Sequence, residues 1–241
     1  MTLLDVRGVT AGDGKLPVIH DVSLSVRESE TVALVGPNGA GKATLLKTVF
    51  RLLKPMSGKI EFSGSDLKAI PTERMARKGM AYVPQGGNTF PTLTVEENIR
   101  VAAMPLGRSK IAAVLDTALD RFPSLRKRRN SSASTLSGGE RQMLAVAGAL
   151  ASNPTFLALD EPTTGLAPTI VQELISRLAD AAGSGVGVLW VVEENPAAIL
   201  PHCSRVHIMQ GGRIGDEQEV AAVLQDEGLR RLFFGIDEAS S

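Results

Sequence analysis

The sequence predicts an α/β fold in which helices cover a mostly parallel sheet, and three observations predict it. Short β-rich apolar runs alternate with segments of helical spacing along most of the chain. A glycine-rich loop directly follows one such run and opens a helix. The segment from about 92 to 152 has helical patterns throughout. Together they predict one domain over 1–241, with an all-helical subdomain, 86–153, inserted within it.

The expected elements follow in chain order. Residues 3–9 and 21–27 alternate apolar with polar side chains, as half-buried strands of an antiparallel edge do. Helical spacing predicts helices at 42–53 and 72–78, and capping boxes at Thr94 and Ser137 predict the starts of two more. Compact apolar runs predict further strands at 31–35, 59–62, 80–83, 155–159, 186–192 and 205–209.

The composition is that of a globular protein, and it disfavours some function classes. Hydrophobic residues make up 43% of the 241 residues and charged residues 22%. The charges of the 26 basic and 26 acidic side chains cancel, so the formal net charge is zero. A protein whose main partner is nucleic acid usually has a net positive charge. No apolar run approaches the roughly 20 residues of a membrane span, and no signal peptide is visible at the N-terminus. We therefore expect any membrane association to come through a partner.

The glycine-rich loop lies between an apolar strand and a helix and reads Gly36-Pro37-Asn38-Gly39-Ala40-Gly41-Lys42. A phosphate-binding loop requires that context, because small residues let successive backbone N–H groups curl around phosphates at a helix N-terminus. Lys42 is predicted to bridge the β- and γ-phosphates. The next position normally carries a hydroxyl that ligates Mg²⁺. Here it is Ala43, and Thr44 is expected to be turned about 100° away around the helix.

A later apolar strand ends in two carboxylates, Asp160 and Glu161. Downstream of a phosphate-binding loop, such a pair predicts a site of nucleotide hydrolysis. Asp160 is predicted to hold the water shell of Mg²⁺, and Glu161 is predicted to polarise the attacking water as general base. ATP and Mg²⁺ are therefore the expected cofactors.

The motif Leu136-Ser137-Gly138-Gly139-Glu140-Arg141-Gln142 matches the signature sequence of ABC transporter ATPases without a change, and the chain resembles that family from residue 3 to about 235. The resemblance implies a P-loop NTPase core with an antiparallel β edge and an inserted helical subdomain. It also implies a homodimer, or a heterodimer with a related cassette, bound to transmembrane permease subunits at the cytoplasmic face of a membrane. A solute-binding protein would be an indirect partner. The residues that face ATP on the opposite subunit would be Ser137, Gly138, Gly139, Glu140 and Gln142.

Other positions agree with the family or depart from it. Gln85 stands where the family has the glutamine that touches Mg²⁺ and links the core to the helical subdomain, and 164–167 stands where the family contacts its partner subunit. Asp13 replaces an aromatic residue that stacks on adenine in relatives. Glu194 stands at the position of the switch histidine, where a carboxylate would repel the γ-phosphate. With Ala43, these departures predict reduced hydrolysis by a site that still has Lys42, Gln85 and Glu161.

Longer strings narrow the resemblance. Residues 15–24, 73–85, 90–98 and 229–235 resemble the branched-chain amino acid uptake cassettes of the LivF type. The resemblance implies an ATP hydrolase that drives uptake of branched-chain or other amino acids. Two alternatives stay open: a urea or short-amide uptake cassette, and a nucleotide-binding partner cassette with weak hydrolysis of its own. An ABC-type DNA-repair or translation protein is disfavoured, because only 86–136 separates Gln85 from Ser137, too few residues for a long coiled-coil insertion.

Overall fold

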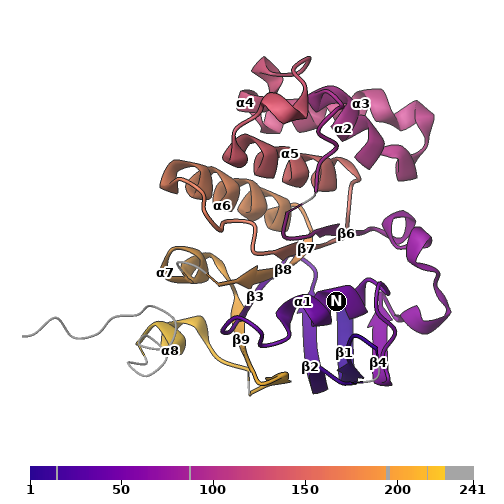
Figure 1. Cartoon of the computed structure of the whole chain (residues 1–241), viewed down its shortest axis with the longest axis vertical. Helices are drawn as coiled ribbons and strands as arrows, with labels where there is room; N and C mark the ends of the chain where they lie inside the picture. The colour runs from indigo at the N-terminus through magenta and orange to yellow at the C-terminus, as the bar shows by residue number, and fades with distance from the viewer. Residues whose placement is uncertain (15, 87, 194–195, 216, 226–241) are drawn as a thin grey trace, which may run out of the picture.

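The computed structural model describes the chain except for residues 15, 87, 194–195, 216 and 226–241. It confirms the α/β fold, with helices above a central sheet and a second sheet below it (Figure 1). The strands are β1 (Thr2–Ala11), β2 (Ile19–Arg27), β3 (Thr31–Val35), β4 (Ser57–Phe62), β5 (Ser65–Asp66), β6 (Met80–Val83), β7 (Phe156–Asp160), β8 (Gly187–Val192), β9 (Arg205–Gln210) and β10 (Arg213–Ile214). The α-helices are α1 (Lys42–Val49), α2 (Val95–Ala102), α3 (Arg108–Arg121), α4 (Pro123–Lys127), α5 (Gly138–Ala151), α6 (Pro168–Gly183), α7 (Pro196–Ile199) and α8 (Val220–Gln225).

Within the described residues, the central sheet has six strands in the order β10-β9-β3-β8-β7-β6. Its strands pair in parallel except for β10, which runs antiparallel to β9. Both faces of the sheet are buried: Val32 and Leu34 belong to one hydrophobic core, and Ala33 and Val35 belong to the other. Burial on both faces explains why these strands are continuous apolar runs rather than alternating ones.

The second sheet contains the alternating strands, in the order β2-β1-β4-β5. The antiparallel pairing expected of 3–9 with 21–27 is present, but these strands form a sheet of their own rather than an edge of the central one. The run 59–62 pairs with β1 as part of β4. The buried side chains of this sheet, among them Val6 and Ile60, pack with α1 against one face of the central sheet. An alternating strand has one apolar face, and this packing buries it.

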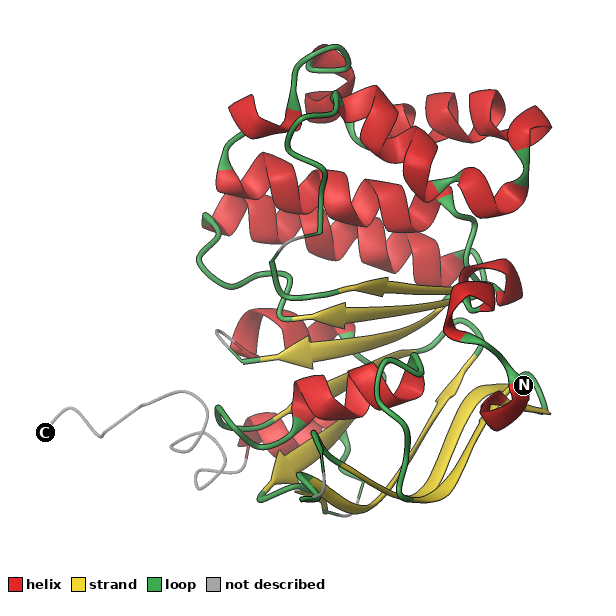
Figure 2. Cartoon of the chain, turned by 45° about the vertical axis from the view of Figure 1, so that its right-hand side comes forward, coloured by secondary structure: helices red, strands yellow, loops and turns green. Residues whose placement is uncertain are grey.

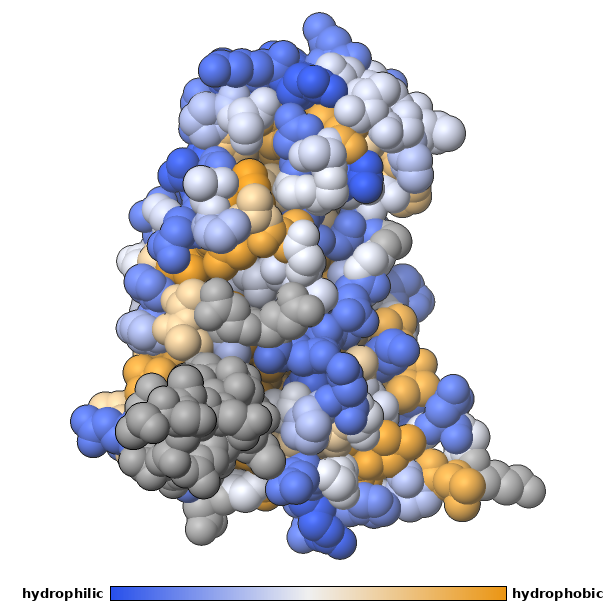
Figure 3. All heavy atoms as spheres, turned by 60° about the vertical axis from the view of Figure 1, so that its left-hand side comes forward, coloured by the Kyte–Doolittle hydropathy of each residue, from blue (hydrophilic) through white to orange (hydrophobic). Residues whose placement is uncertain are grey.

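The upper layer is helical from α2 to α5, and α6 lies between it and the central sheet (Figures 1 and 2). Both predicted capping boxes form, at Thr94 with Glu97 and at Ser137 with Glu140. The buried side chains of α2 to α6 join the upper face of the central sheet in one core. On the face in Figure 3, hydrophilic residues predominate at the top of the molecule. None of the helices in the described residues has the length and apolarity to cross a membrane. The subdomain boundaries 86–153 stay a prediction.

Two predicted helices are shorter than expected. The helix predicted at 42–53 ends at Val49, because Arg51 takes a left-handed φ of 60° and the N–H groups of Leu52 and Leu53 both donate back to the Lys47 carbonyl. The segment 72–78 forms two short 3₁₀ turns instead of one α-helix. These turns end, as expected, at Gly79, whose φ is 88°.

Candidate functional site

The loop 36–42 connects the carboxyl end of β3 to the N-terminus of α1. Close packing requires two of its glycines: a Cβ on Gly36 would lie 2.1 Å from the carbonyl oxygen of Met209, and one on Gly41 would lie 2.7 Å from Cγ2 of Ile19. The N-terminus of α1 has no side-chain cap, and the first turn of this fully described helix contains no acidic residue. Its first N–H groups are therefore available to an anion.

Lys42 is held inside this loop and is only 5% exposed. Its Nζ donates to the carbonyl oxygen of Gly36 at 2.7 Å and to that of Pro37 at 3.1 Å. The same Nζ lies 3.8 Å from Oε1 of Glu161. The ammonium group is thus placed between the loop and the carboxylates at the carboxyl end of the sheet, where it would meet the phosphates of a nucleotide.

A cavity of about 260 Å³ brings the loop together with residues distant in the sequence. It is lined by Val18, Asn38, Gly39, Gly41, Lys42, Ala43, Thr44, Gln85 and Glu161. Gly36, Pro37 and Ala40 shape the loop instead: the first two bind Lys42, and the N–H of Ala40 donates to Pro37. The structure therefore places Gln85 and Glu161 beside the predicted phosphate loop.

Asp160 ends β7, and Glu161 follows it with a left-handed φ of 50°. That conformation is sparsely populated for a residue with a side chain, and such strain is often found at functional sites. Asp160 is 4% exposed. Burial raises the pKa of its carboxyl, while a hydrogen bond from Tyr82 and the charges of Lys42 and Lys47 oppose the rise.

The carboxyl of Glu161 lies among three partners. Nε2 of Gln85 donates to its Oε2 at 2.7 Å, Lys42 lies near its other oxygen, and the Glu193 carboxyl is close enough to raise its pKa. Burial raises the pKa of Glu161 to about 7, helped by the neighbouring Glu193 carboxyl and by the charge of Asp160, and opposed by Lys42. A carboxyl with a pKa near 7 is suited to accept a proton from water near neutral pH.

The oxygen-bearing side chains at this site fit a magnesium ion. Proteins usually hold Mg²⁺ by one or two carboxylates together with the phosphates of a nucleotide, and waters complete the shell. Gln85 supplies an amide oxygen at the wall of the cavity. Asp160 supplies a buried carboxylate next to Glu161, although Asp160 does not itself line the cavity. In the part of the chain that the structure describes, no group of three or more His, Cys, Asp or Glu side chains could hold a metal by itself. The oxygen donors of Asp160 and Gln85 suit a metal ion that phosphates also ligate.

The predicted signature residues lie apart from this cavity. Among the described residues that line it, none belongs to the set Ser137, Gly138, Gly139, Glu140 and Gln142. Ser137 and Gly138 are exposed at the N-terminus of α5. Gln142 accepts a hydrogen bond of 3.2 Å from Nδ2 of Asn88, which also donates to the Pro84 carbonyl. Asn88 therefore ties α5 to the segment that carries Gln85.

The three positions at which the sequence departs from the family pattern, Asp13, Ala43 and Glu194, lie in different parts of the chain. Ala43 lines the cavity and offers no oxygen there. Thr44, the next residue of α1, lines the cavity too. Asp13 is exposed in the turn between β1 and β2, and Val18 at the end of that turn reaches the cavity instead. Glu194 lies outside the described residues.

Sequence reasoning missed three residues of the site: Tyr82, Asn88 and Glu193. Tyr82 precedes Gln85 by three positions on a predicted strand, and Glu193 directly follows another one. Because the carboxyl ends of parallel strands meet at one edge of a sheet, the position of Glu193 was a usable signal. Asn88 had no such signal, because its contact with Gln142 depends on how the helical layer is placed.

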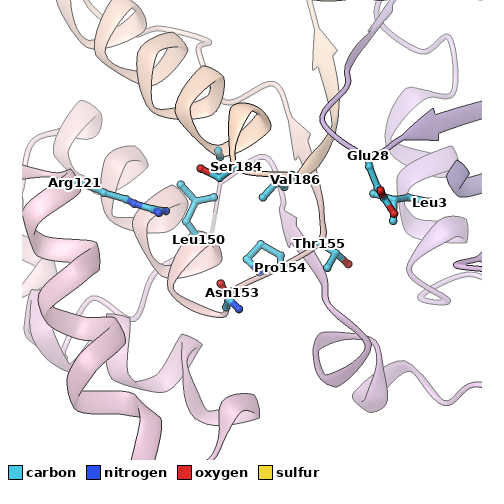
Figure 4. A pocket seen from close by; sticks show the side chains of 11 residues that line it. Leu3, Glu28, Arg121, Leu150, Asn153, Pro154, Thr155, Ser184 and Val186 are labelled. Atoms are coloured by element: carbon cyan, nitrogen blue, oxygen red, sulfur yellow. The ribbon is translucent and has the colours of Figure 1, made fainter. Parts of the chain in front are cut away.

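A larger cavity, of about 380 Å³, lies elsewhere (Figure 4). Its wall includes the C-terminal ends of α3, α5 and α6, where the backbone presents carbonyl groups rather than N–H groups. Its charged side chains, Arg121 and Glu28, lie on opposite sides of the cavity rather than pointing together. Of these two cavities, the smaller one holds the converging charged groups, so volume does not identify the candidate site.

Comparison with known proteins points to one family. The sequence profile described as ABC transporter matches residues 19–164. The chain is 39% identical to the high-affinity branched-chain amino acid transport ATP-binding protein BraG of Pseudomonas aeruginosa, over 92% of this chain and 95% of the relative. It is 36% identical to the probable branched-chain amino acid transport ATP-binding protein LivF of Archaeoglobus fulgidus, over 95% and 97%. It is also 34% identical to the lipopolysaccharide export system ATP-binding protein LptB of Haemophilus influenzae, over 98% of both chains.

A solved structure agrees with these relatives. A structure described as the ATP-binding subunit of an ABC transporter superposes with a TM-score of 0.83, at 29% identity, over 97% of this chain and 96% of that one. The match spans the sheets and the helical layer alike. The fold and the sequence motifs therefore identify the same family.

Proposed function

Because this chain belongs to the ABC transporter family of ATP-binding proteins, we propose that it binds and hydrolyses ATP to drive uptake of branched-chain or other amino acids through a membrane permease. The observation that carries ATP hydrolysis is the cavity in which Lys42, Gln85 and Glu161 converge on a phosphate-binding loop. The amino acid assignment is supported by what BraG and LivF are named for.

In this proposal the residues of the chain divide the work. The N–H groups of the loop and Lys42 bind the phosphates, and Glu161 accepts a proton from the attacking water. Asp160 and Gln85 would hold Mg²⁺, which supplies neutralisation of the charge on the phosphates. Ser137 and its neighbouring glycines would cover ATP bound to a second cassette, so two cassettes would be needed to enclose each nucleotide.

The experiment that tests the function uses the cassette with its own permease in proteoliposomes. Hydrolysis of Mg-ATP should rise when leucine, isoleucine or valine is supplied together with the solute-binding protein. Stimulation by urea alone would support the short-amide alternative. Stimulation by lipopolysaccharide alone would place the chain with exporters such as LptB, and hydrolysis unaffected by any of these solutes would contradict the uptake proposal.

One alternative, a partner cassette with weak hydrolysis of its own, is favoured by a specific observation. Ala43 lines the cavity where a hydroxyl would otherwise lie near the metal. Hydrolysis by the purified chain, measured with and without a related partner cassette, separates the two cases. Turnover that appears only with a partner, and survives Glu161→Gln in this chain, would assign hydrolysis to the partner's site.

The permease is proposed to contact the loop that follows Gln85. Phe90 is 55% exposed in this loop, although it is a large apolar side chain. Asn98, buried in α2, fixes the backbone there: its Oδ1 accepts from the Phe90 N–H at 2.7 Å, and its Nδ2 donates to the carbonyls of Phe90, Leu93 and Thr94. A fixed backbone would present Phe90 to a partner in one conformation.

Replacing Phe90 and Leu93 with serine should uncouple transport from hydrolysis. The double variant loses the exposed apolar contact, while the phosphate loop and the carboxylates stay untouched. We expect solute uptake to fall at least tenfold, about 1.4 kcal/mol of lost coupling, and ATP affinity to stay within twofold of wild type. Uptake in proteoliposomes and nucleotide binding by the purified chain measure the two effects.

Leu52→Ser is the matched control, because Leu52 is an equally exposed apolar side chain on the loop after α1. It should leave uptake unchanged. If the double variant instead loses thermal stability and ATP affinity together, Phe90 and Leu93 serve the local core and not a partner.

A further inference from the structure

Tyr82 connects the edge strand of the central sheet to the buried carboxylate of the site. It pairs with Ala158 in the register of β6 with β7. Since alternate residues of a strand share a face, Asp160 lies on the same side of the sheet two positions further on. The hydroxyl of Tyr82 donates to Oδ2 of Asp160 at 3.1 Å. The bond joins two neighbouring strands at the point where the site begins.

The ring of Tyr82 is itself held in place. It stacks on Phe50 with ring centroids 5.0 Å apart and an interplanar angle of 21°. Phe50, the residue after α1, stacks in turn on Phe156 of β7. Burial raises the pKa of the Tyr82 hydroxyl, and the neighbouring Asp160 carboxylate raises it further. Tyr82 therefore remains a hydrogen-bond donor throughout the physiological pH range.

Asp160 depends on this one donor. It is almost fully buried, and among the described residues no other hydrogen bond to its carboxylate is formed. Burying a carboxylate costs free energy of desolvation, and hydrogen bonds to the carboxylate offset part of that cost. When a donor is removed, the offset from its hydrogen bond is lost. Lys42 and Lys47 contribute only through their charge. The hydroxyl is thus the group that fixes how the carboxylate is oriented.

We propose that Tyr82 is a positioning residue for the magnesium site, holding the Asp160 carboxylate in the orientation that a metal ion requires. The inference rests on the proposed function, because it assumes that Asp160 binds Mg²⁺ together with ATP. Tyr82 itself touches neither nucleotide nor metal. Because Tyr82 already orients the carboxylate, metal binding does not have to supply the free energy for orienting it.

The test compares Tyr82→Phe with wild type in nucleotide binding rather than in turnover. Tyr82→Phe keeps the ring stack and removes only the hydroxyl. The Mg²⁺ concentration that half-maximally tightens binding of a fluorescent ATP analogue should rise about tenfold, as expected for loss of one hydrogen bond to a charged group. Affinity for the same analogue in excess chelator should stay unchanged, because the loop and Lys42 bind the phosphates without the metal.

Phe50→Leu is the control, since it removes the ring stack and retains the hydroxyl. It should lower thermal stability and leave the Mg²⁺ dependence where it was. Equal Mg²⁺ dependence in Tyr82→Phe and wild type would overturn the proposal, and so would an equal shift in both variants, which would mean that packing alone is responsible. A wild-type chain whose nucleotide affinity ignores Mg²⁺ would contradict the proposed function itself, an outcome distinct from either of these.

Discussion

The Glu161→Gln variant should bind ATP, fail to hydrolyse it and accumulate as a dimer of cassettes. Loss of a general base typically slows a reaction by about 10²–10⁴-fold. The substitution preserves the hydrogen bond from Gln85, because the side-chain oxygen of glutamine at position 161 can accept it as Glu161 does. Among the described residues that line the cavity of one chain, the signature residues are absent, and under the proposed function a second cassette supplies them to enclose the nucleotide. Light scattering with excess Mg-ATP should show the mass of the particle doubling.

The control for this result is the same variant with Lys42→Ala added. Without the ammonium group the phosphates lose their main charged partner, so the double variant should stay monomeric under identical conditions. A Glu161→Gln chain that stays monomeric with Mg-ATP, alone and with every related cassette, would contradict the composite site. The dimer is therefore tested independently of the transported solute.

Ala43→Thr should raise the rate of ATP hydrolysis and make it more dependent on Mg²⁺. Ala43 lines the cavity without offering an oxygen, and water in its place is not oriented in advance. A preorganised stabilising group is typically worth about 10²–10³-fold in rate, so the gain is expected to approach that range. Hydrolysis by the purified chain, measured against Mg²⁺ concentration, reports both effects.

Ala43→Val is the matched control, because valine has the shape of threonine without the hydroxyl. It should leave turnover at the wild-type level. Glu194→His should raise turnover mainly in the Ala43→Thr background, because both positions are predicted to act on the same phosphate charge and their effects should not simply add. Equal turnover in wild type and Ala43→Thr would show that position 43 does not limit the chemistry.

The sequence was sufficient for the parts of the site that are local. The loop 36–42, the pair at the end of β7 and both capping boxes are read from neighbouring residues, because their geometry is set within one turn or one strand end. The sequence did not predict that β1 and β2 belong to a separate sheet. Alternation shows that one face of a strand is buried, and it does not show which layer covers that face.

The contacts that sequence reasoning missed join distant segments. The bond from Tyr82 to Asp160 depends on the register of two strands, and the contact of Glu193 with Glu161 depends on the order of strands in the sheet. Neither follows from periodicity. The end of the helix predicted at 42–53 was misplaced for a local reason, because apolar side chains at Leu52 and Leu53 continue a helical pattern after the backbone has turned at Arg51.

The two hydrogen bonds of Lys42 to its own loop have a thermodynamic consequence. This ammonium group already has backbone acceptors in Gly36 and Pro37. Arrival of a phosphate is therefore an exchange of acceptors and not the satisfaction of an unpaired charge, so the enthalpy of binding reports only the difference between them. A substitution of Lys42 would therefore remove two contacts within the loop as well as a contact to the phosphates.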